Sequence, residues 1–475
     1  MAEVLTPDIC VIGAGSGGLT VAAAAASFGV SVVLIEKGKM GGDCLNYGCV
    51  PSKALLAAGK QAQSMRSGSK FGIAPAEPQV NFKSVMAHVK SVIAEIAPND
   101  SVERFTALGV RVIQAEAKFG DKRTVFAGDH EVRARRFVIA TGSSALVPPI
   151  PGLSDVDYLT NETLFEQERL PTHLIIIGGG PIGMEMAQAH RRLGAEVTVI
   201  EAFAALGKDD PETASIILSA LRAEGISILE NTKVVSVERR GKLGVRVHVE
   251  GPAGATVVDG TRLLVAAGRI ANVGGLDLEK AGIQFDRRGI KTGSNLRTTN
   301  SRVYAIGDVA GSLQFTHMAG YHAGLVVRSI LFRLPIKENR AIIPWATFTE
   351  PELAQVGLSE PEAKKSGVPF KILRWPFSEN DRAVAEHKAA GLIKILTSPK
   401  GRILGVSIAG HGAGEMINMW ALAVSKGLGV RDIASYVAPY PTMSEAGKRA
   451  AVSYFAPFSR SLRLRKLIGF LRRFG

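Results

Sequence analysis

The stretch that decides the fold is Asp8-Ile9-Cys10-Val11-Ile12-Gly13-Ala14-Gly15-Ser16-Gly17-Gly18, an apolar run that ends in a cluster of glycines. We expect the apolar residues to form a buried strand and the alanine-rich residues that follow to form a helix. A second buried strand is expected over residues 30–35, and Glu36 stands at its end. The glycines with the G-x-G-x-x-G spacing of a dinucleotide-binding turn are Gly13, Gly15 and Gly18.

The same module occurs again at Leu174-Ile175-Ile176-Ile177-Gly178-Gly179-Gly180-Pro181-Ile182-Gly183. A helix to about residue 193 and a strand over residues 196–200 follow, and Glu201 stands at the end of that strand. Its spaced glycines are Gly178, Gly180 and Gly183. Either module alone is also compatible with an ordinary glycine turn in an α/β sheet that binds no nucleotide. Cys10 is expected to be an inert strand residue that faces the core. Two modules together predict two sites in which a helix N-terminus holds a pyrophosphate and the glutamate binds a ribose.

Two of the three cysteines lie in Gly41-Gly42-Asp43-Cys44-Leu45-Asn46-Tyr47-Gly48-Cys49-Val50-Pro51-Ser52-Lys53, at the start of a predicted helix. A helix N-terminus favours the thiolate of a cysteine, and Lys53 can add a positive charge from the same helix face. We expect Cys44 and Cys49 to form a redox disulphide. The alternatives are a structural disulphide or two buried thiols, but a long chain with only three cysteines rarely needs a disulphide for its stability.

The position of the cysteine pair assigns the two nucleotides. The pair follows closely after the first module in the sequence, so the ligand of the first module should be the redox partner of the disulphide. We therefore assign FAD to the first module. The second module lies further along the chain and suits a mobile reductant. Glu201 would repel the 2′-phosphate of NADP, and residues 202–207 contain no arginine or lysine to accept it. We therefore predict NAD.

Composition favours a cytoplasmic, multidomain enzyme. With 475 residues, of which 46% are hydrophobic, the chain can form about three domains with full cores. The start, Met1-Ala2-Glu3, lacks a basic segment, so no secretory signal is expected, and residues 19–35 favour a helix, a turn and a strand over a membrane span. The net charge is +14, and more than half of the excess lies in residues 446–475. The rest of the sequence shows no basic face and no known nucleic-acid-binding motif, so no nucleic-acid partner is predicted.

The cysteine motif resembles the active-site segment of the flavin-dependent pyridine nucleotide-disulphide oxidoreductases, the family of dihydrolipoamide dehydrogenase, glutathione reductase and mercuric reductase. The resemblance covers about residues 8–455, and the run Trp345-Ala346-Thr347-Phe348-Thr349-Glu350-Pro351 is similar to the start of the family's C-terminal domain. It implies an α/β fold with two Rossmann-like domains and a C-terminal α+β dimerisation domain. The implied regions are 1–150 and 273–341 for FAD, 151–272 for NAD, 342–455 for the interface of a homodimer, and a basic amphipathic tail over 456–475.

The resemblance also implies roles for particular residues. Three strands that end in small residues, at 137–143, 263–269 and 303–308, match segments that line the cofactors, and residues 232–259 look like the β-meander of the NAD domain. Asp308 would bind the ribityl chain of FAD. The other residues implied to lie at FAD are Gly42, Ala117, Thr141, Gly142, Ser143, Gln314 and His317, and those implied to lie at NAD are Val234 and Gly268.

The implied mechanism has two halves. NADH, with its nicotinamide near Glu185, passes hydride to FAD, and a Lys53–Glu185 ion pair tunes the flavin ring. Reduced flavin then opens the disulphide, with Cys49 as the charge-transfer thiolate and Cys44 facing the substrate. The direction reverses if a dithiol is the donor. The alternatives are a reductase of a quinone or metal ion, and a flavin-binding scaffold without catalysis, against which the intact Cys44, Cys49 and Lys53 argue.

The interface loop departs from the thiol-handling members of the family. Those members carry a His-Pro-Thr segment and a glutamate, and the histidine exchanges a proton with the substrate thiol. Here the loop reads Ala438-Pro439-Tyr440-Pro441-Thr442-Met443-Ser444-Glu445. A phenol, with a pKa near 10, accepts a proton less readily than imidazole. A tyrosine in this loop is similar to mercuric reductases, yet the chain ends Arg472-Arg473-Phe474-Gly475, without their C-terminal cysteine pair. Thiols, disulphides, metal ions and quinones all remain candidate substrates.

The last segment, Arg460 to Gly475, lies beyond the resemblance. Its apolar residues follow the i, i+3, i+4, i+7 spacing of one helical face, and its basic residues fall on the other. Such a helix suits peripheral contact with an anionic membrane or an acidic protein partner. The alternative is a terminal helix that packs on the dimer.

Overall fold

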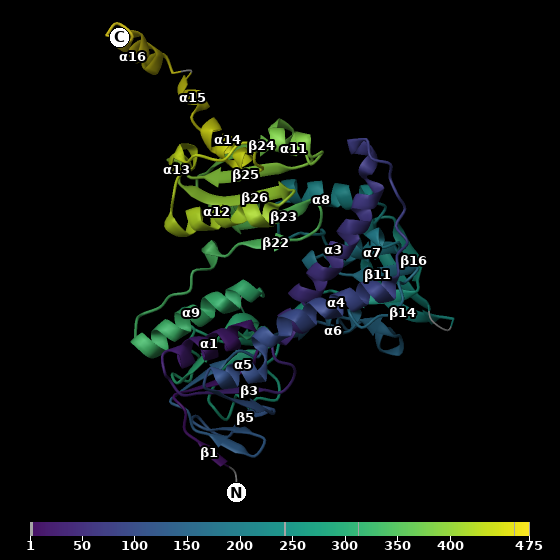
Figure 1. The fold of residues 1–475 in the computed structure, drawn as a ribbon, viewed down its shortest axis with the longest axis vertical. Helices are drawn as coiled ribbons and strands as arrows, with labels where there is room; N and C mark the ends of the chain where they lie inside the picture. Colours follow the sequence, from purple (N-terminus) through teal and green to yellow (C-terminus); the bar gives the residue numbers. More distant parts are fainter. Residues whose placement is uncertain (1–2, 242–243, 312, 460, 475) are drawn as a thin grey trace.

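The computed structural model describes residues 3–241, 244–311, 313–459 and 461–474 (Figure 1). The fold has three main sheets, which the helices cover. The first sheet is completed by a strand that follows the second sheet in the sequence. The predicted ends of the domains near residues 150 and 272 lie in connections between sheets, and the third lies in a short helical turn at Arg340–Ile342. The boundaries themselves stay predictions.

The first sheet carries the first glycine turn. Its strands are β21 (Val303–Ala305), β8 (Arg136–Ile139), β2 (Ile9–Ile12), β3 (Val32–Glu36) and β4 (Val110–Gln114), in that order and all parallel. Both faces are covered, which explains why β2 is apolar throughout. Helices α1 (Ser16–Ser27) and α9 (Thr316–Phe332) pack on one face. On the other lies a small sheet of β1 (Glu3–Leu5), β5 (Ala117–Phe119), β6 (Val125–Ala127) and β7 (His130–Val132), with Cys10 fully buried between the sheets.

The second sheet repeats this arrangement around the second glycine turn. Its parallel strands are β10 (Tyr158–Leu159), β17 (Arg262–Val265), β11 (His173–Ile177), β12 (Glu196–Ile200) and β13 (Ser227–Leu229), with α7 (Pro181–Arg192) and α8 (Pro211–Ala223) against it. The expected meander is present as the antiparallel strands β14 (Lys233–Arg240), β15 (Gly244–Gly251) and β16 (Gly254–Gly260).

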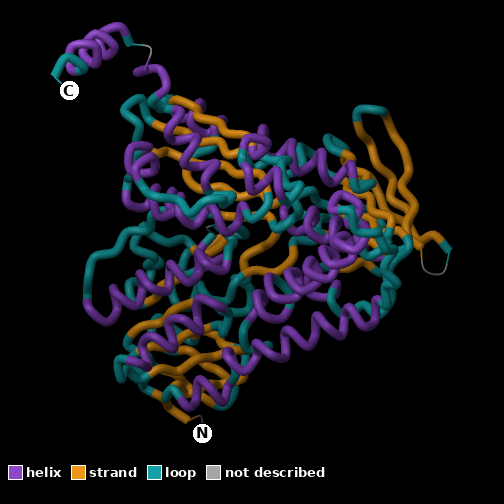
Figure 2. Tube along the Cα trace, turned by 45° about the horizontal axis from the view of Figure 1, so that its top comes forward, coloured by secondary structure: helices purple, strands orange, loops and turns teal. Residues whose placement is uncertain are grey.

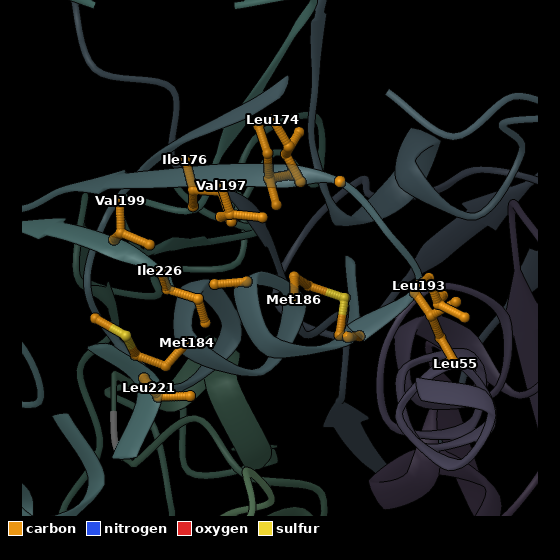
Figure 3. Packing of buried hydrophobic residues seen from close by; sticks show 14 of the residues in the cluster. Leu55, Leu174, Ile176, Met184, Met186, Leu193, Val197, Val199, Leu221 and Ile226 are labelled. Carbon is orange, nitrogen blue, oxygen red and sulfur yellow. The ribbon is translucent and has the colours of Figure 1, made fainter. Parts of the chain in front are cut away.

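Each main sheet and the helices around it form one region, and helix α3 (Cys49–Arg66) joins the first region to the second. It begins beside the first glycine turn and packs along α7 of the second region, so that Leu55 lies near Leu193 in the apolar cluster (Figure 3). Gly59 permits this approach, because a Cβ there would lie 3.3 Å from the Cα of Ala189. The contact brings residues of the two regions together beside the cysteines.

The third sheet is antiparallel and carries the C-terminal region. Its order is β22 (Trp345–Thr347), β23 (Glu352–Gly357), β26 (Ile403–Gly410), β25 (Leu392–Thr397) and β24 (Lys371–Pro376), and α12 (Ala413–Lys426) and α14 (Glu445–Ser453) cover it. The remaining elements are α2 (Gly42–Asn46), α4 (Phe82–Ile96), α5 (Val102–Ala107), β9 (Ser143–Ala145), α6 (Asn161–Leu164), β18 (Arg269–Ala271), β19 (Phe285–Asp286), β20 (Gly289–Ile290), α10 (Glu360–Ser366), α11 (Asp381–Ala385), α13 (Val430–Ser435), α15 (Ala456–Ser459) and α16 (Leu462–Leu471).

Buried ion pairs link the second region to the third. Arg192 of α7 lies 2.7 Å from Glu224 and 2.9 Å from Glu350, and its side chain is 7% exposed. Lys394 of β25 lies 2.9 Å from Asp210, just before α8, and both side chains are almost fully buried. Buried charges persist when they are paired in this way, so these contacts fix how the two regions sit against each other.

The C-terminal tail stands away from the rest of the molecule (Figures 1 and 2). Helix α16 forms as predicted, and its side chains from Leu462 to Leu471 are all exposed. Arg460 and Gly475 lie outside the described residues. Among the described residues, no helix combines the length and apolar character that a bilayer crossing requires.

Candidate functional site

The predicted site residues gather around one large cavity. Its volume is about 2380 Å³, whereas a pocket for one drug-sized ligand measures about 300–1,000 Å³. Both glycine turns and both cysteines line it, as do most of the other cofactor residues predicted from the sequence, among them Gly42, Lys53, Ala117, Thr141, Gly142, Ser143, Gly268, Asp308, Gln314 and His317. The cavity therefore has room for two dinucleotides placed end to end around the cysteines.

The first glycine turn has the shape that a dinucleotide requires. Gly13 has φ +105°, and a Cβ there would lie 2.5 Å from the carbonyl oxygen of Ala140, while a Cβ on Gly18 would lie 1.9 Å from that of Gly13. A Cβ on Gly15 would meet nothing within 4 Å, so the side facing the cavity is open. Gly15 begins α1 without a side-chain cap, which leaves N–H groups for a pyrophosphate.

The second turn repeats this geometry position by position. A Cβ on Gly178 would lie 2.3 Å from the Ala266 oxygen and one on Gly183 would lie 2.0 Å from the Gly178 oxygen, whereas Gly180 again faces open space. Helix α7 also begins without a side-chain cap. Both turns thus fit a dinucleotide for the same steric reasons.

Each module ends in a glutamate that is already held by backbone N–H groups. Glu36 accepts hydrogen bonds from Ala14 (2.6 Å) and Gly38 (2.7 Å). Glu201 accepts hydrogen bonds from Gly179 (2.7 Å) and Phe203 (3.0 Å). The carboxylates are therefore fixed at the cavity wall, where each can receive a ribose diol.

The cysteines lie on two helices rather than on one, which corrects the expected start of a single helix. Cys44 lies in α2, the chain turns at Tyr47 and Gly48, and Cys49 is the first residue of α3. The thiols are free in this structure. Hydrogen bonds from Cys44 and Thr316, together with the charge of Lys53, lower the pKa of Cys49 to about 6, while the pKa of Cys44 is raised. Cys49 is thus the thiolate of the pair at neutral pH.

The Lys53–Glu185 pair joins three parts of the chain. Lys53 Nζ lies 2.7 Å from Glu185 Oε2. The backbone N–H of Phe348 donates a 2.9 Å hydrogen bond to Glu185 Oε1, and Lys53 Nζ lies 4.5 Å from the centre of the Phe348 ring. Glu185 is 5% exposed. One carboxylate therefore holds together α3, α7 and the start of the third region.

Asp308 belongs to a network that sequence patterns did not reveal. Ser143 donates a 2.5 Å hydrogen bond to Asp308, and Arg269 donates to Ser143 at 2.7 Å and lies 3.2 Å from Asp43. Burial raises the pKa of Asp308. Arg269 follows a predicted site residue, Gly268, but no motif distinguishes it from a surface arginine.

Two family models match the chain. The model described as pyridine nucleotide-disulphide oxidoreductase matches residues 7–323, and its dimerisation domain matches residues 343–451. The mercuric reductase of Bacillus cereus is 36% identical over 450 residues, which cover 94% of this chain and 71% of that protein. The chain belongs to this family. It is an FAD-dependent pyridine nucleotide-disulphide oxidoreductase that binds NAD(P)H, and the dimerisation-domain match supports a homodimer.

Other members have similar sequences or structures. A dihydrolipoyl dehydrogenase of Thermus scotoductus is 35% identical over 461 residues, covering 94% of this chain and 97% of that protein. LpdA of Mycobacterium tuberculosis superposes with a TM-score of 0.86 and 26% identity, over 95% of this chain and 99% of that one. RclA of Escherichia coli, a HOCl-induced flavoprotein disulfide reductase solved as a Cu(II) complex, superposes with a TM-score of 0.82 and 28% identity, over 92% and 98%.

Five of the predicted site residues are absent from the described lining of the cavity: Gly18, Gly183, Val234, Tyr440 and Glu445. Gly18 and Gly183 pack against the backbone of their own turns. Val234 pairs with Val249 in the meander. Tyr440 is 69% exposed in the loop before α14, and its hydroxyl donates a 2.9 Å hydrogen bond to Asp381, which raises its pKa. Glu445 is the first residue of α14. Tyr440 and Glu445 do not meet the cysteines within one chain, so their roles stay predictions.

Thr316 is a second contact that the sequence did not indicate. Its hydroxyl lies 3.3 Å from Cys49 Sγ, and it begins α9, far along the chain from the cysteines. The only available signal was its position between the predicted residues Gln314 and His317. His317 contributes a ring nitrogen 2.7 Å from the Pro344 carbonyl oxygen, and burial lowers its pKa. A donor beside a thiolate stabilises the charge, so Thr316 acts together with Lys53 on Cys49.

Proposed function

We propose that this enzyme uses NADH to reduce a small disulphide, thiol-bound species or metal ion through Cys44 and Cys49. The observation that carries the proposal is the placement of the pair: Cys49 is the first residue of α3, with the Thr316 hydroxyl 3.3 Å from its Sγ and Lys53 one turn along the helix. These neighbours lower the pKa of Cys49, whereas the pKa of Cys44 is raised. Opening a disulphide takes two electrons and one proton, and leaves a thiol on Cys44 and a thiolate on Cys49. When bound, FAD accepts hydride from the nicotinamide and supplies these electrons.

The chain's own residues would position the reactants. The N-termini of α1 and α7 would hold the two pyrophosphates, and Glu36 and Glu201 the two riboses. Asp308 would bind the ribityl chain, with Arg269 and Ser143 orienting its carboxylate. The Lys53–Glu185 pair would set the charge beside the flavin ring. Cys44 would meet the substrate on the side away from the flavin.

Reduced holoenzyme should show a long-wavelength thiolate–flavin band that fades as the pH falls through about 6, because Cys49 then gains its proton. The thiolate is present above its pKa, so the band is full at pH 8. Replacing Lys53 by methionine should move the midpoint to higher pH, because a positive charge no longer favours the thiolate. Spectral titration measures the midpoint, and Lys60→Met, further along the same helix, is the control. A midpoint that does not move in Lys53→Met would contradict this role.

The enzyme should use NADH at least about tenfold better than NADPH, because Glu201 would lie against the extra phosphate. The cavity also contains Arg222, but this arginine is paired with Glu230 at 2.6 Å. The ratio of kcat/KM for NADH to kcat/KM for NADPH tests the preference. Glu201→Gln keeps the shape of the side chain and removes its charge, so it should lower this ratio. Equal kcat/KM values for the two nucleotides in the wild type would overturn the assignment.

The substrate is best identified by an acceptor screen. NADH oxidation is followed with lipoamide, oxidised glutathione, Hg(II), Cu(II) and quinones, for the wild type and Cys44→Ser. Activity that Cys44→Ser loses with one acceptor only would identify it. Quinone reduction that survives in Cys44→Ser would favour direct transfer from flavin, and equal low rates with every acceptor would favour a scaffold. The metal ions are included because related proteins are named mercuric reductase and one is solved with Cu(II).

We propose the cytoplasm, including the inner face of the membrane, as the place where the enzyme acts. NADH is available there, and a reduced dithiol is stable in that compartment. The basic tail supports contact with the membrane face.

A further inference from the structure

Helix α16 turns an apolar face toward solvent. The exposed fractions on this face are 36% for Leu464, 51% for Leu467, 48% for Ile468, 54% for Leu471 and 75% for Phe474. Counted from Leu464, they stand at positions i, i+3, i+4, i+7 and i+10, so they line one side of the helix and of the turn that follows it. Large apolar side chains at such spacing normally cover a core, and here the figures show the helix standing clear of the molecule (Figures 1 and 2). The face is therefore available for an external surface.

The opposite face is positively charged. It carries Arg465 and Lys466, and Arg472 and Arg473 follow directly after the helix; all four are exposed. Arg463 lies at the border between the two faces, where a long side chain can place its charge outward while its stem follows the apolar side. Residues 446–475 contain eight lysines and arginines and no aspartate or glutamate.

We propose that α16 lies flat on an anionic lipid surface, with its apolar face among the acyl chains and its cations among the headgroups. The combination of a short amphipathic helix, a bulky apolar face and an excess of lysine and arginine is the one that interfacial helices use. The inference depends on the proposed function in one respect, the placement of the enzyme in the cytoplasm. It does not depend on which electron acceptor the enzyme uses.

The irregularity of the apolar face favours lipid over a protein groove. Leu462 and Phe470 lie outside the face, and Gly469 interrupts the polar side. A groove in a partner protein selects apolar residues in a fixed register, whereas a bilayer accepts an uneven face. A bilayer also offers a continuous layer of negative charge, which matches cations spread over the whole length of the helix.

A homodimer would carry two copies of this tail. The tail leaves the body after α14 and passes through α15, so α16 is held at the end of a short connection rather than against the cavity. In a homodimer there are two such tails on one particle. The second helix then binds at a raised effective concentration, which compensates for the weak affinity of one short helix.

The test is co-sedimentation of the FAD-loaded, full-length enzyme with vesicles of mixed phosphatidylglycerol and phosphatidylcholine, at low and moderate salt. We expect binding that salt weakens, little binding to pure phosphatidylcholine, and none after truncation behind Phe458. Turnover with a small acceptor should be unchanged by the truncation, so a failed lipid test and a failed function test are distinguishable.

Point variants separate the two faces. Arg465→Glu with Lys466→Glu should weaken binding at least about 25-fold, taking about fivefold for each lost cation near an anionic surface. The matched control is Lys83→Glu with Lys90→Glu on α4, which makes the same charge change on exposed residues elsewhere. Leu467→Asp should abolish insertion, and Leu471→Trp, on the apolar face, should report insertion by a blue shift of the added tryptophan's fluorescence.

The proposal is overturned if full-length enzyme stays in the supernatant with phosphatidylglycerol vesicles, which would leave a protein partner or a second copy to cover the face. It is equally overturned if the truncated enzyme binds as well as the full chain, or if the α4 control weakens binding as much as the α16 variant.

Discussion

Replacing Cys49 by serine should remove the long-wavelength absorption of the reduced enzyme and lower acceptor turnover at least about a thousandfold. The thiolate at the start of α3 is the group that receives stabilisation from Cys44, Thr316 and Lys53, and a serine hydroxyl does not ionise in the same range. Absorption spectra after addition of NADH and steady-state NADH oxidation measure the two effects.

Two companion variants make this result specific. Cys44→Ser should keep the band, since Cys49 remains, but should lose turnover of every acceptor that is reduced through the pair. Cys10→Ala removes a thiol that is fully buried in β2, and it should leave both the band and the turnover in place. A band that persists in Cys49→Ser would contradict the assignment of the thiolate.

Replacing Tyr440 by histidine should raise the rate of NAD⁺ reduction by dihydrolipoamide by about two to four orders of magnitude, the usual contribution of a general base. The tyrosine hydroxyl donates a hydrogen bond to Asp381, and this bond raises a pKa that is already far above neutral. Proton acceptance from a substrate thiol is therefore unfavourable, whereas an imidazole titrates near the working pH.

The control for this experiment is Tyr440→Phe, which removes the hydroxyl without adding a base and should not raise the rate. The prediction is contradicted if the wild type already turns over lipoamide as fast as its best acceptor. In that case Glu445 or the substrate itself would have to accept the proton.

The nucleotide-binding halves of the fold could be predicted because their determinants are local. Gly13 and Gly178 need a positive φ, and Gly18 and Gly183 need the absence of a side chain, within a few residues of the strand that precedes them. The same holds for α16, whose apolar spacing alone predicts a helix. A short pattern suffices where neighbours in sequence are neighbours in space.

The electrostatic surroundings of the site depend on distant parts of the chain. Thr316, Arg269 and Phe348 reach the cavity from three distant parts of the chain. Thr316 and Arg269 stand beside predicted site residues, but no motif indicates which groups they contact. The break between α2 and α3 was also missed, because Tyr47 and Gly48 are compatible with a continuing helix until packing against the first glycine turn is known. Lys53 and Glu185 were paired only through family resemblance.

The ion pairs at Arg192 and Lys394 bear on attempts to build chimeric enzymes. A graft that replaces the second region with that of a relative, to change nucleotide preference, would cut between Arg192 and Glu350 and between Asp210 and Lys394. Lys394 would then keep only Glu360 of its three acidic partners, and Glu350 would lose Arg192. Breaking a buried ion pair costs up to about 3–5 kcal/mol. Glu350 and Lys394 therefore have to be exchanged together with the graft, so the natural unit of exchange is larger than the nucleotide-binding region itself.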